Sequence, residues 1–173
     1  IPFRKEVYTH LTNAVYISQN GWNYAKKKYG QYLFNSCYSY LGTRDFGPRT
    51  IIPQDGYIHI LSCSNVIPVK RIHLILEALL LIKNNQIVWT HIGAGKEWLD
   101  LKKRTQQVPQ NLQINLVGAM SNSDVIKYYQ TEPIDIFINV SSSEGLPVSI
   151  MEAISFDIPV LATNVGGTSE IVT

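Results

Sequence analysis

Along most of the chain, short apolar runs alternate with segments in which apolar residues recur every three or four positions. The short runs contain many β-branched residues and end at glycine or small polar residues, which is the pattern of buried β-strands. The segments between them have the spacing of amphipathic helices. Five apolar runs occur, at residues 57–63, 87–92, 112–117, 134–140 and 158–163. The clearest helical stripe is that of Ile72, Ile75, Leu76, Leu79 and Leu80.

Five strands that alternate with helices at short intervals predict an α/β fold, a doubly wound parallel sheet of Rossmann-like type with right-handed crossovers. In such sheets, ligands bind outside the carboxyl ends of the strands. In this sequence those ends carry glycine and small polar residues, in the segments Ser64-Asn65, Gly93-Ala94-Gly95, Gly118, 141–145 and 164–167. We therefore expect a ligand site at this edge of the sheet.

The first part of the chain has a weaker pattern. Residues 13–18 and 33–41 resemble strands, and between them Asn20 is expected to cap a helix that Gly30 ends. Residues 43–56 contain two glycines, two prolines and scattered charges, which is typical of a linker. Because the chain starts without methionine and stops in a predicted helix, we expect it to be a fragment of a longer protein.

The composition narrows the class of protein. Of 173 residues, 45% are hydrophobic and 16% are charged, and the net charge of +2 is too small to indicate nucleic-acid binding. Cys37 and Cys63 lie in strand-like runs and are expected to be buried free thiols in a reducing compartment. The histidines have no ligand spacing and no Asp-x-Asp pair occurs, so no metal site is predicted. The most apolar run, residues 72–82, is too short to span a bilayer.

The most informative stretch is residues 141–153, which follows the fourth predicted strand. Serines and a Gly-Leu-Pro sequence open a loop, and Pro147 fits the first turn of a new helix, where free backbone N–H groups favour an anion. Glu144 lies in the loop and Glu152 lies on the helix. A carboxylate on a mostly apolar helix needs a polar partner or a wet cleft. The alternative is that Ser149, Glu152 and Ser155 form a solvated stripe.

A second candidate anion site follows the first strand of the sheet. Lys70 and Arg71 are expected to start the next helix, where a cation opposes the helix dipole unless an anion is bound. The alternative is that both are simply exposed basic residues. The Gly93-Ala94-Gly95 segment does not complete a dinucleotide-binding fingerprint, because Trp98 stands where the third glycine would be, and no Walker lysine motif is present.

Taken together, these segments resemble one known family. The sequences "SCSNVIPVKRIHLILEAL", "HIGAG", "VGAM" and "DIFINVSSSEGLPVSIMEAISFDIPVLATNVGGTSEIV" are similar to the C-terminal, donor-binding domain of retaining GT-B glycosyltransferases of family 4, also called group 1. The similarity covers residues 57–173. It includes the Glu-x7-Glu motif at Glu144 and Glu152. Residues 1–42 resemble, less specifically, the end of the family's N-terminal, acceptor-side domain, which makes 43–56 the linker.

The resemblance implies a role for each motif residue. Lys70 would hold the diphosphate of a nucleotide sugar, and Glu144 would contact the sugar near the reacting carbon. Glu152 would accept both ribose hydroxyls, a task for which a carboxylate has enough acceptor oxygens. The phosphates would meet the backbone of Leu146 and Val148. The other residues assigned to donor binding are Gly145, Pro147, Asn65, Arg71, Gly93 and Gly118. The base of the nucleotide would lie beside Gly118.

The sequence departs from the family pattern at two of these positions. Asn65 stands where the family often has arginine, and Pro147, which has no N–H group, stands where it often has glycine. Arg71 is therefore a candidate for the second cation at the diphosphate.

The reaction implied is transfer of a sugar, a hexosyl group, from a nucleotide diphosphate sugar to a polysaccharide or lipid-linked acceptor, with retention of configuration and without a cofactor or metal. The resemblance implies a cytoplasmic location, with peripheral association at the inner face of the membrane through the N-terminal domain. Because that domain would hold the acceptor, we expect this chain alone to be inactive in transfer. Two alternatives remain open: a sugar-nucleotide epimerase of the same architecture, and a non-catalytic nucleotide-binding module.

Overall fold

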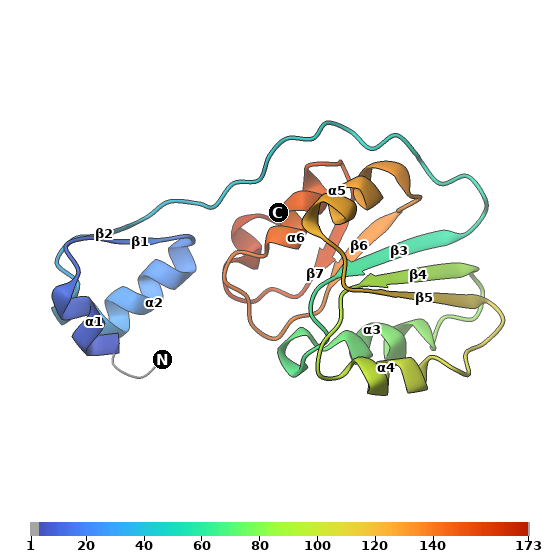
Figure 1. Ribbon diagram of the computed structural model, residues 1–173, viewed down its shortest axis with the longest axis horizontal. Coiled ribbons are helices and arrows are strands. Elements are labelled where there is room, and N and C mark those ends of the chain that lie inside the picture. The colour runs from blue at the N-terminus through green and yellow to red at the C-terminus, as the bar shows by residue number, and fades with distance from the viewer. Residues whose placement is uncertain (1–3, 173) are drawn as a thin grey trace. The chain divides into compact units, whose positions relative to one another are not determined.

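The computed structural model describes residues 4–172 (Figure 1). By their internal contacts these residues form two compact units. The sheet unit consists of residues 43–143 and 148–163. The segmented unit is built from three separate stretches, of which 4–42, 144–147 and 164–172 are described.

The sheet unit contains a five-stranded sheet in which every pair of neighbours is parallel. The order across the sheet is β5-β4-β3-β6-β7, so the chain winds outward in both directions from β3. The strands are β3 (Ile58–Cys63), β4 (Ile87–Ile92), β5 (Leu112–Gly118), β6 (Ile136–Asn139) and β7 (Val160–Ala162). The five runs predicted from the sequence, and their parallel doubly wound arrangement, are confirmed.

Two layers of helices cover this sheet. Figure 1 shows α3 and α4 on one face, with α5 and α6 on the other. A right-handed crossover after each parallel strand places the helices in this way. The helices are α3 (Ile72–Leu79), α4 (Trp98–Arg104), α5 (Asn122–Thr131) and α6 (Val148–Ile154), and a 3₁₀ turn, η2 (Pro68–Lys70), precedes α3.

Each layer has its own apolar core. The stripe of α3 packs with Trp89 and Ile60 of the sheet and with Leu101 of α4, and all of these side chains are buried except Leu80, which follows the helix and is partly buried. On the opposite face the Tyr129 ring lies against the rings of Phe137 and Phe156, at centroid distances of 6.1 and 5.8 Å. These large side chains leave water completely, which is the main term that stabilises the sheet unit.

Residues 43–56 contain no helix or strand. They pack on the sheet unit, and the Asp55 carboxylate lies 2.9 Å from Nε2 of His59 in β3. The Phe46 ring stacks on Phe156 at 5.5 Å, and the Thr50 N–H group donates to the carbonyl of Gln130 at 2.9 Å. This segment therefore packs as part of the sheet unit.

The segmented unit has a parallel strand pair and two helices. They are α1 (Arg4–His10), β1 (Ala14–Tyr16), α2 (Gln19–Tyr29) and β2 (Ser36–Tyr38), with 3₁₀ turns η1 (Gly30–Tyr32) and η3 (Thr168–Glu170). The sequence pattern did not predict α1. The cap of α2 was assigned wrongly: Ser18, and not Asn20, accepts from the Gly21 N–H group.

Two further expectations need correction. Cys37 is exposed and Cys63 only partly buried, although both are free thiols as expected. The last predicted helix is a single 3₁₀ turn within the described residues, and Thr173 lies outside them. Within residues 4–172, no helix is long and apolar enough to cross a membrane.

Candidate functional site

The carboxyl ends of β3, β4 and β5 are joined by backbone hydrogen bonds. Gly93 donates to the carbonyl of Gly118 at 2.7 Å, and Val66 donates to that of Ala94 at 3.0 Å. Gly93 has φ of +136°, and a Cβ atom there would lie 1.9 Å from the carbonyl oxygen of Ser64. Only glycine fits so close an approach of two loops. Three of the loops predicted to face a ligand are thus brought together, with Gly93 and Gly118 in contact.

A buried polar chain lies beneath these loops. His91 is fully buried, and its Nδ1 lies 2.8 Å from the Ser62 hydroxyl, which accepts from the indole N–H of Trp89 at 3.0 Å. Burial lowers the pKa of His91 to about 4, and the nearby Ser64 backbone opposes this shift only in part. His91 is therefore neutral at physiological pH. The Nε2 atom, which makes no hydrogen bond of good geometry, lies next to Gly93.

The structure places Lys70 and Arg71 differently from the expectation that they start α3. Lys70 ends the turn η2, and Arg71 adopts a left-handed conformation with φ of +50° before α3 begins at Ile72. The Arg71 guanidinium donates to the carbonyls of Val140 and Ser141 at 2.8 and 3.0 Å. Arg71 thus ties the loop after β3 to the end of β6.

Lys70 and Asn65 lie on that same loop after β3. The half-buried Lys70 lines a small hollow formed by the ends of β3 and β6, together with Ser64 and Ser141. Asn65 is exposed. Lys70, and not Arg71, therefore lines this small hollow at the predicted edge of the sheet.

Glu152 is the most buried carboxylate in the described residues, with 7% of its surface exposed. Its Oε1 accepts a hydrogen bond of 2.9 Å from the side-chain amide of Asn122, the first residue of α5. The pKa of the neighbouring Cys63 thiol is raised to about 11, mainly because the thiol is buried and also because the charge of Glu152 is near. The solvated-stripe interpretation of Glu152 is wrong, because this carboxylate has a specific partner in a mostly apolar surrounding.

The other glutamate of the motif, Glu144, lies in the segmented unit with Gly145, Leu146 and Pro147. This loop is held against residues 166–167: the Gly167 N–H group donates to the Gly145 carbonyl at 2.9 Å, and a Cβ atom on Gly166 would lie 1.9 Å from the Glu144 carbonyl oxygen. Leu146 and Pro147 are buried, and Glu144 is half-buried. The exposed Val148 begins α6, so the predicted helix is present and Pro147 directly precedes its first turn.

A long-range carboxylate contact completes the segmented unit. The Glu170 carboxylate accepts from the backbone N–H groups of Gln19 and Asn20, both at 2.8 Å. These N–H groups belong to the first turn of α2, which has no helical acceptor for them. Ser18, Gly145 and Leu146 all line the position that a Cβ atom on Gly167 would occupy. Residues 18–20, 144–146 and 166–170 thus form one packed cluster.

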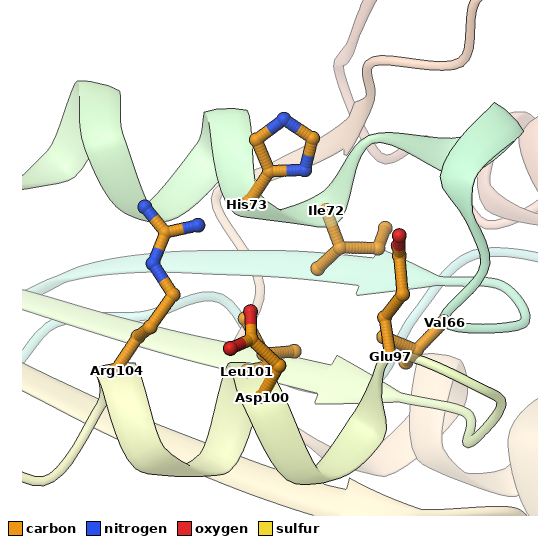
Figure 2. A pocket seen from close by; sticks show the side chains of 7 residues that line it. All are labelled: Val66, Ile72, His73, Glu97, Asp100, Leu101 and Arg104. Atoms are coloured by element: carbon orange, nitrogen blue, oxygen red, sulfur yellow. The ribbon is translucent and has the colours of Figure 1, made fainter.

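Figure 2 shows a further hollow, between α3 and α4, that the sequence did not predict. It is lined by apolar and by charged or polar side chains, which are Val66, Ile72 and Leu101 together with His73, Glu97, Asp100 and Arg104. Arg104 also pairs with the exposed Glu77 at 2.7 Å. Among the described residues, no group of three or more His, Cys, Asp or Glu side chains is arranged to hold a metal ion.

Sequence reasoning identified Glu152 and the glycine loops, but it missed Asn122, the partner of Glu152, and the buried pair of Ser62 and His91 beneath the loops. Asn122 directly follows Ser121, whose hydroxyl caps α5 by accepting from the Asp124 N–H group, but a cap position does not reveal that Asn122 bonds to Glu152. Ser62 and His91 had no signal, because isolated polar residues within a mostly apolar strand do not reveal their partners.

Comparison with known proteins gives a consistent picture. The family model described as "Glycosyl transferases group 1" matches residues 48–173. The O-antigen biosynthesis glycosyltransferase WbnH of Escherichia coli and the probable O-antigen biosynthesis glycosyltransferase WbiN of the same organism are each 35% identical to this chain over 82 residues. Those residues are 47% of this chain and 22% of each relative. The chain thus matches about a fifth of the length of these curated relatives.

Solved structures share the fold at low sequence identity. TarM of S. aureus, determined in complex with Fondaparinux, alpha-GlcNAc-glycerol and UDP, aligns with a TM-score of 0.81 at 16% identity, over 98% of this chain and 34% of TarM. Alr3699/HepE of Anabaena, determined with UDP and glucose, aligns with a TM-score of 0.72 at 17% identity, over 98% of this chain and 49% of HepE.

Proposed function

Because this chain belongs to the glycosyl transferases of group 1 and has a GT-B type of fold, we propose that it supplies the donor-binding half of a retaining glycosyltransferase. The donor is a nucleotide diphosphate sugar that carries a hexosyl group, and the acceptor is a saccharide or a lipid-linked saccharide. Residues 1–42 then represent the end of the acceptor-side domain, and 57–173 represent the donor domain.

The observation that carries this proposal is the state of Glu152. The Glu152 carboxylate is 7% exposed and is held through Oε1 alone, so its Oε2 atom, which reaches solvent, can accept hydrogen bonds from a ligand. A ribose diol offers two adjacent O–H donors of this kind. The family membership supplies the rest of the ligand. Asn122, the partner of Glu152, follows Gly118 at the carboxyl end of β5 by four residues.

The remaining roles follow the family motif. Lys70 balances the diphosphate charge, and the backbone at Leu146 and Val148 adds N–H donors, while Gly145 and Pro147 shape that loop. Glu144 contacts the donor sugar. No metal is needed in this proposal, because a preorganised cation and backbone donors stabilise the leaving diphosphate as its charge develops. With Arg71 bonded to two carbonyls, Lys70 is the principal side-chain cation at the phosphates.

The chain by itself should bind the nucleotide but should not transfer the sugar. Holding acceptor and donor in line contributes roughly 7–11 kcal/mol to barrier reduction. The acceptor site is assigned to the rest of the N-terminal domain, and the curated relatives are several times longer than the stretch that matches.

The test is calorimetric titration with uridine, adenosine and guanosine diphosphates and the matching nucleosides, followed by product analysis with a labelled sugar nucleotide. Lys70→Ala should weaken binding of the preferred diphosphate by about 1.5–3 kcal/mol and leave the nucleoside unchanged, whereas Lys102→Ala on exposed α4 should change neither. Equal losses for both ligands would remove Lys70 from the phosphate site.

Product analysis separates the alternatives. An isomerised sugar nucleotide would favour the epimerase, and binding without any product from the full-length protein would favour the non-catalytic module. Glycosyl transfer by the present chain alone would contradict the assignment of the acceptor site.

A further inference from the structure

We propose that Asn122 is a positioning residue that fixes the Glu152 carboxylate for recognition of the donor ribose. This inference rests on the proposed function, and it adds a specificity-determining residue that lies outside the Glu-x7-Glu motif. Asn122 is exposed at the start of α5, yet its side chain reaches inward to a carboxylate that is almost completely buried.

The hydrogen bond defines the orientation of both groups. An ionised carboxylate only accepts hydrogen bonds, so the Asn122 amide must present its Nδ2 donor to Oε1. Oε2 accepts no hydrogen bond from any residue in the range 4–172, and it keeps access to solvent. One oxygen is therefore held, and the other is left open.

This arrangement suits a vicinal diol. Each carboxylate oxygen has two acceptor sites, so Oε2 and the second site of Oε1 can take the two ribose hydroxyls while Asn122 occupies the first site of Oε1. Neighbouring Ile150, Met151 and Ala153 are buried apolar residues of the same helix. Without the amide, the carboxylate would be free to rotate, and part of the ligand's binding energy would be spent on ordering it.

Asn122 also links two parts of the site. It lies four residues after Gly118, which ends β5, whereas Glu152 lies on α6. The Ser121 cap, whose hydroxyl accepts from the Asp124 N–H group at 3.2 Å, holds this start of α5 in place. The side chain of Asn122 is therefore presented by a rigid helix end and not by a mobile loop.

The titratable groups around Glu152 stay neutral over the range tested below. The Cys63 thiol of β3 has a pKa of about 11, and burial raises the pKa of the Tyr129 phenol of α5 well above its usual value. Both groups interact electrostatically with Glu152. The Asp124 carboxylate of the same helix turn accepts from the Ser121 hydroxyl at 2.6 Å and is present in parent and variant alike. A pH dependence that appears only in the variant can therefore be assigned to the pair that residue 122 and Glu152 form.

The first experiment measures dissociation constants of the preferred nucleoside diphosphate and of its 2′-deoxy and 2′,3′-dideoxy forms. The parent chain should prefer the ribose form by about tenfold, the effect of a hydrogen bond to a charged group. Asn122→Ala should reduce this preference by about threefold to tenfold and should leave binding of the dideoxy form within about twofold. Asn84→Ala, in an exposed turn, is the matched control and should retain the full preference.

A second variant gives a signature that a purely structural role would not produce. Asn122→Asp keeps the shape and suits the start of a helix, where a negative charge is stabilising, so α5 should remain folded. It places two carboxyls together, which raises the pKa of the pair. The ribose preference should be lost at about pH 8 and should return towards about pH 5.5, as one shared proton restores the donor to Oε1.

The outcomes separate the two proposals. A parent chain that binds ribose and dideoxy forms equally would contradict the ribose assignment of Glu152, and with it the proposed function of this carboxylate. A parent that prefers ribose, with Asn122→Ala keeping the same preference and Asn122→Asp showing no recovery at low pH, would overturn the role of Asn122 alone.

Discussion

The two units of this chain are stabilised in different ways. The sheet unit consists almost entirely of one continuous stretch in which each of the strands β3 to β6 is followed by a helix, and its core includes Trp89, Phe137 and Phe156 with no exposed surface. The segmented unit joins three distant stretches. Its contacts include close glycine approaches at 166–167 and the Glu170 carboxylate on the first turn of α2.

The two glutamates of the Glu-x7-Glu motif lie in different units, and each has a different structural environment. Glu152 belongs to the sheet unit, is buried among apolar residues and has its orientation fixed by a side-chain amide. Glu144 belongs to the segmented unit and follows a backbone held by Gly166 and Gly167. We therefore expect hydrophobic burial to stabilise the sheet unit. We expect hydrogen bonds and backbone geometry to stabilise the segmented unit. Three predictions test this contrast.

The largest effect is expected for a large-to-small change in the sheet unit. Phe137→Ala removes a fully buried ring between Tyr129 and the sheet, and it should lower the free energy of unfolding by about 3–5 kcal/mol. Phe34→Ala, at a side chain that is 87% exposed in the segmented unit, should change it by less than about 0.5 kcal/mol. Urea unfolding followed by circular dichroism measures both. Similar losses for the two variants would contradict the contrast between the units.

An intermediate effect is expected from pH, again in the sheet unit. The pKa of His91 is about 4 in the folded protein and 6.5 unperturbed, so the unfolded chain binds the proton more readily. Stability from this group is fully present above pH 6.5 and is lost as the pH falls towards 4, by about 3 kcal/mol at about 1.4 kcal/mol per pH unit.

The measurement is the free energy of unfolding at several pH values between 4 and 7, compared with His91→Gln, which cannot titrate. The difference between parent and variant should shrink steadily as the pH falls. His10→Gln, at an exposed position of the segmented unit, is the control and should follow the parent curve. A constant difference between parent and His91→Gln would show that His91 takes up no proton on unfolding.

The smallest effect is expected in the segmented unit. Glu170→Gln removes the charge that accepts from the N–H groups of Gln19 and Asn20, and it should destabilise α2 by about 1 kcal/mol, the usual contribution of a helix cap. Amide hydrogen exchange should show faster exchange in α2 and no change in β3 or β4. Ser169→Ala, at the exposed neighbour, should leave both regions unchanged. Faster exchange across the whole sheet would mean that the two units unfold as one.

The sequence by itself determined the order and type of the elements in the sheet unit. The helix stripe at Ile72–Leu79 and the five apolar runs were all confirmed, because periodicities of two and of three to four residues reflect local backbone geometry. It also indicated that Glu152 needs a partner. The short α1 was missed because seven residues with little apolar pattern give a weak periodic signal.

Only the tertiary structure decided which residues act together. Asn122 meets Glu152 across 30 residues, and Glu170 meets Gln19 across 151. Arg71 turned out to bond to Val140 and Ser141, and did not start a helix. Such pairs depend on the strand order and register that bring distant segments together, and no local pattern encodes them. Burial and hydrogen-bond partners were therefore fixed by packing, whereas the elements that carry them were fixed by the local sequence.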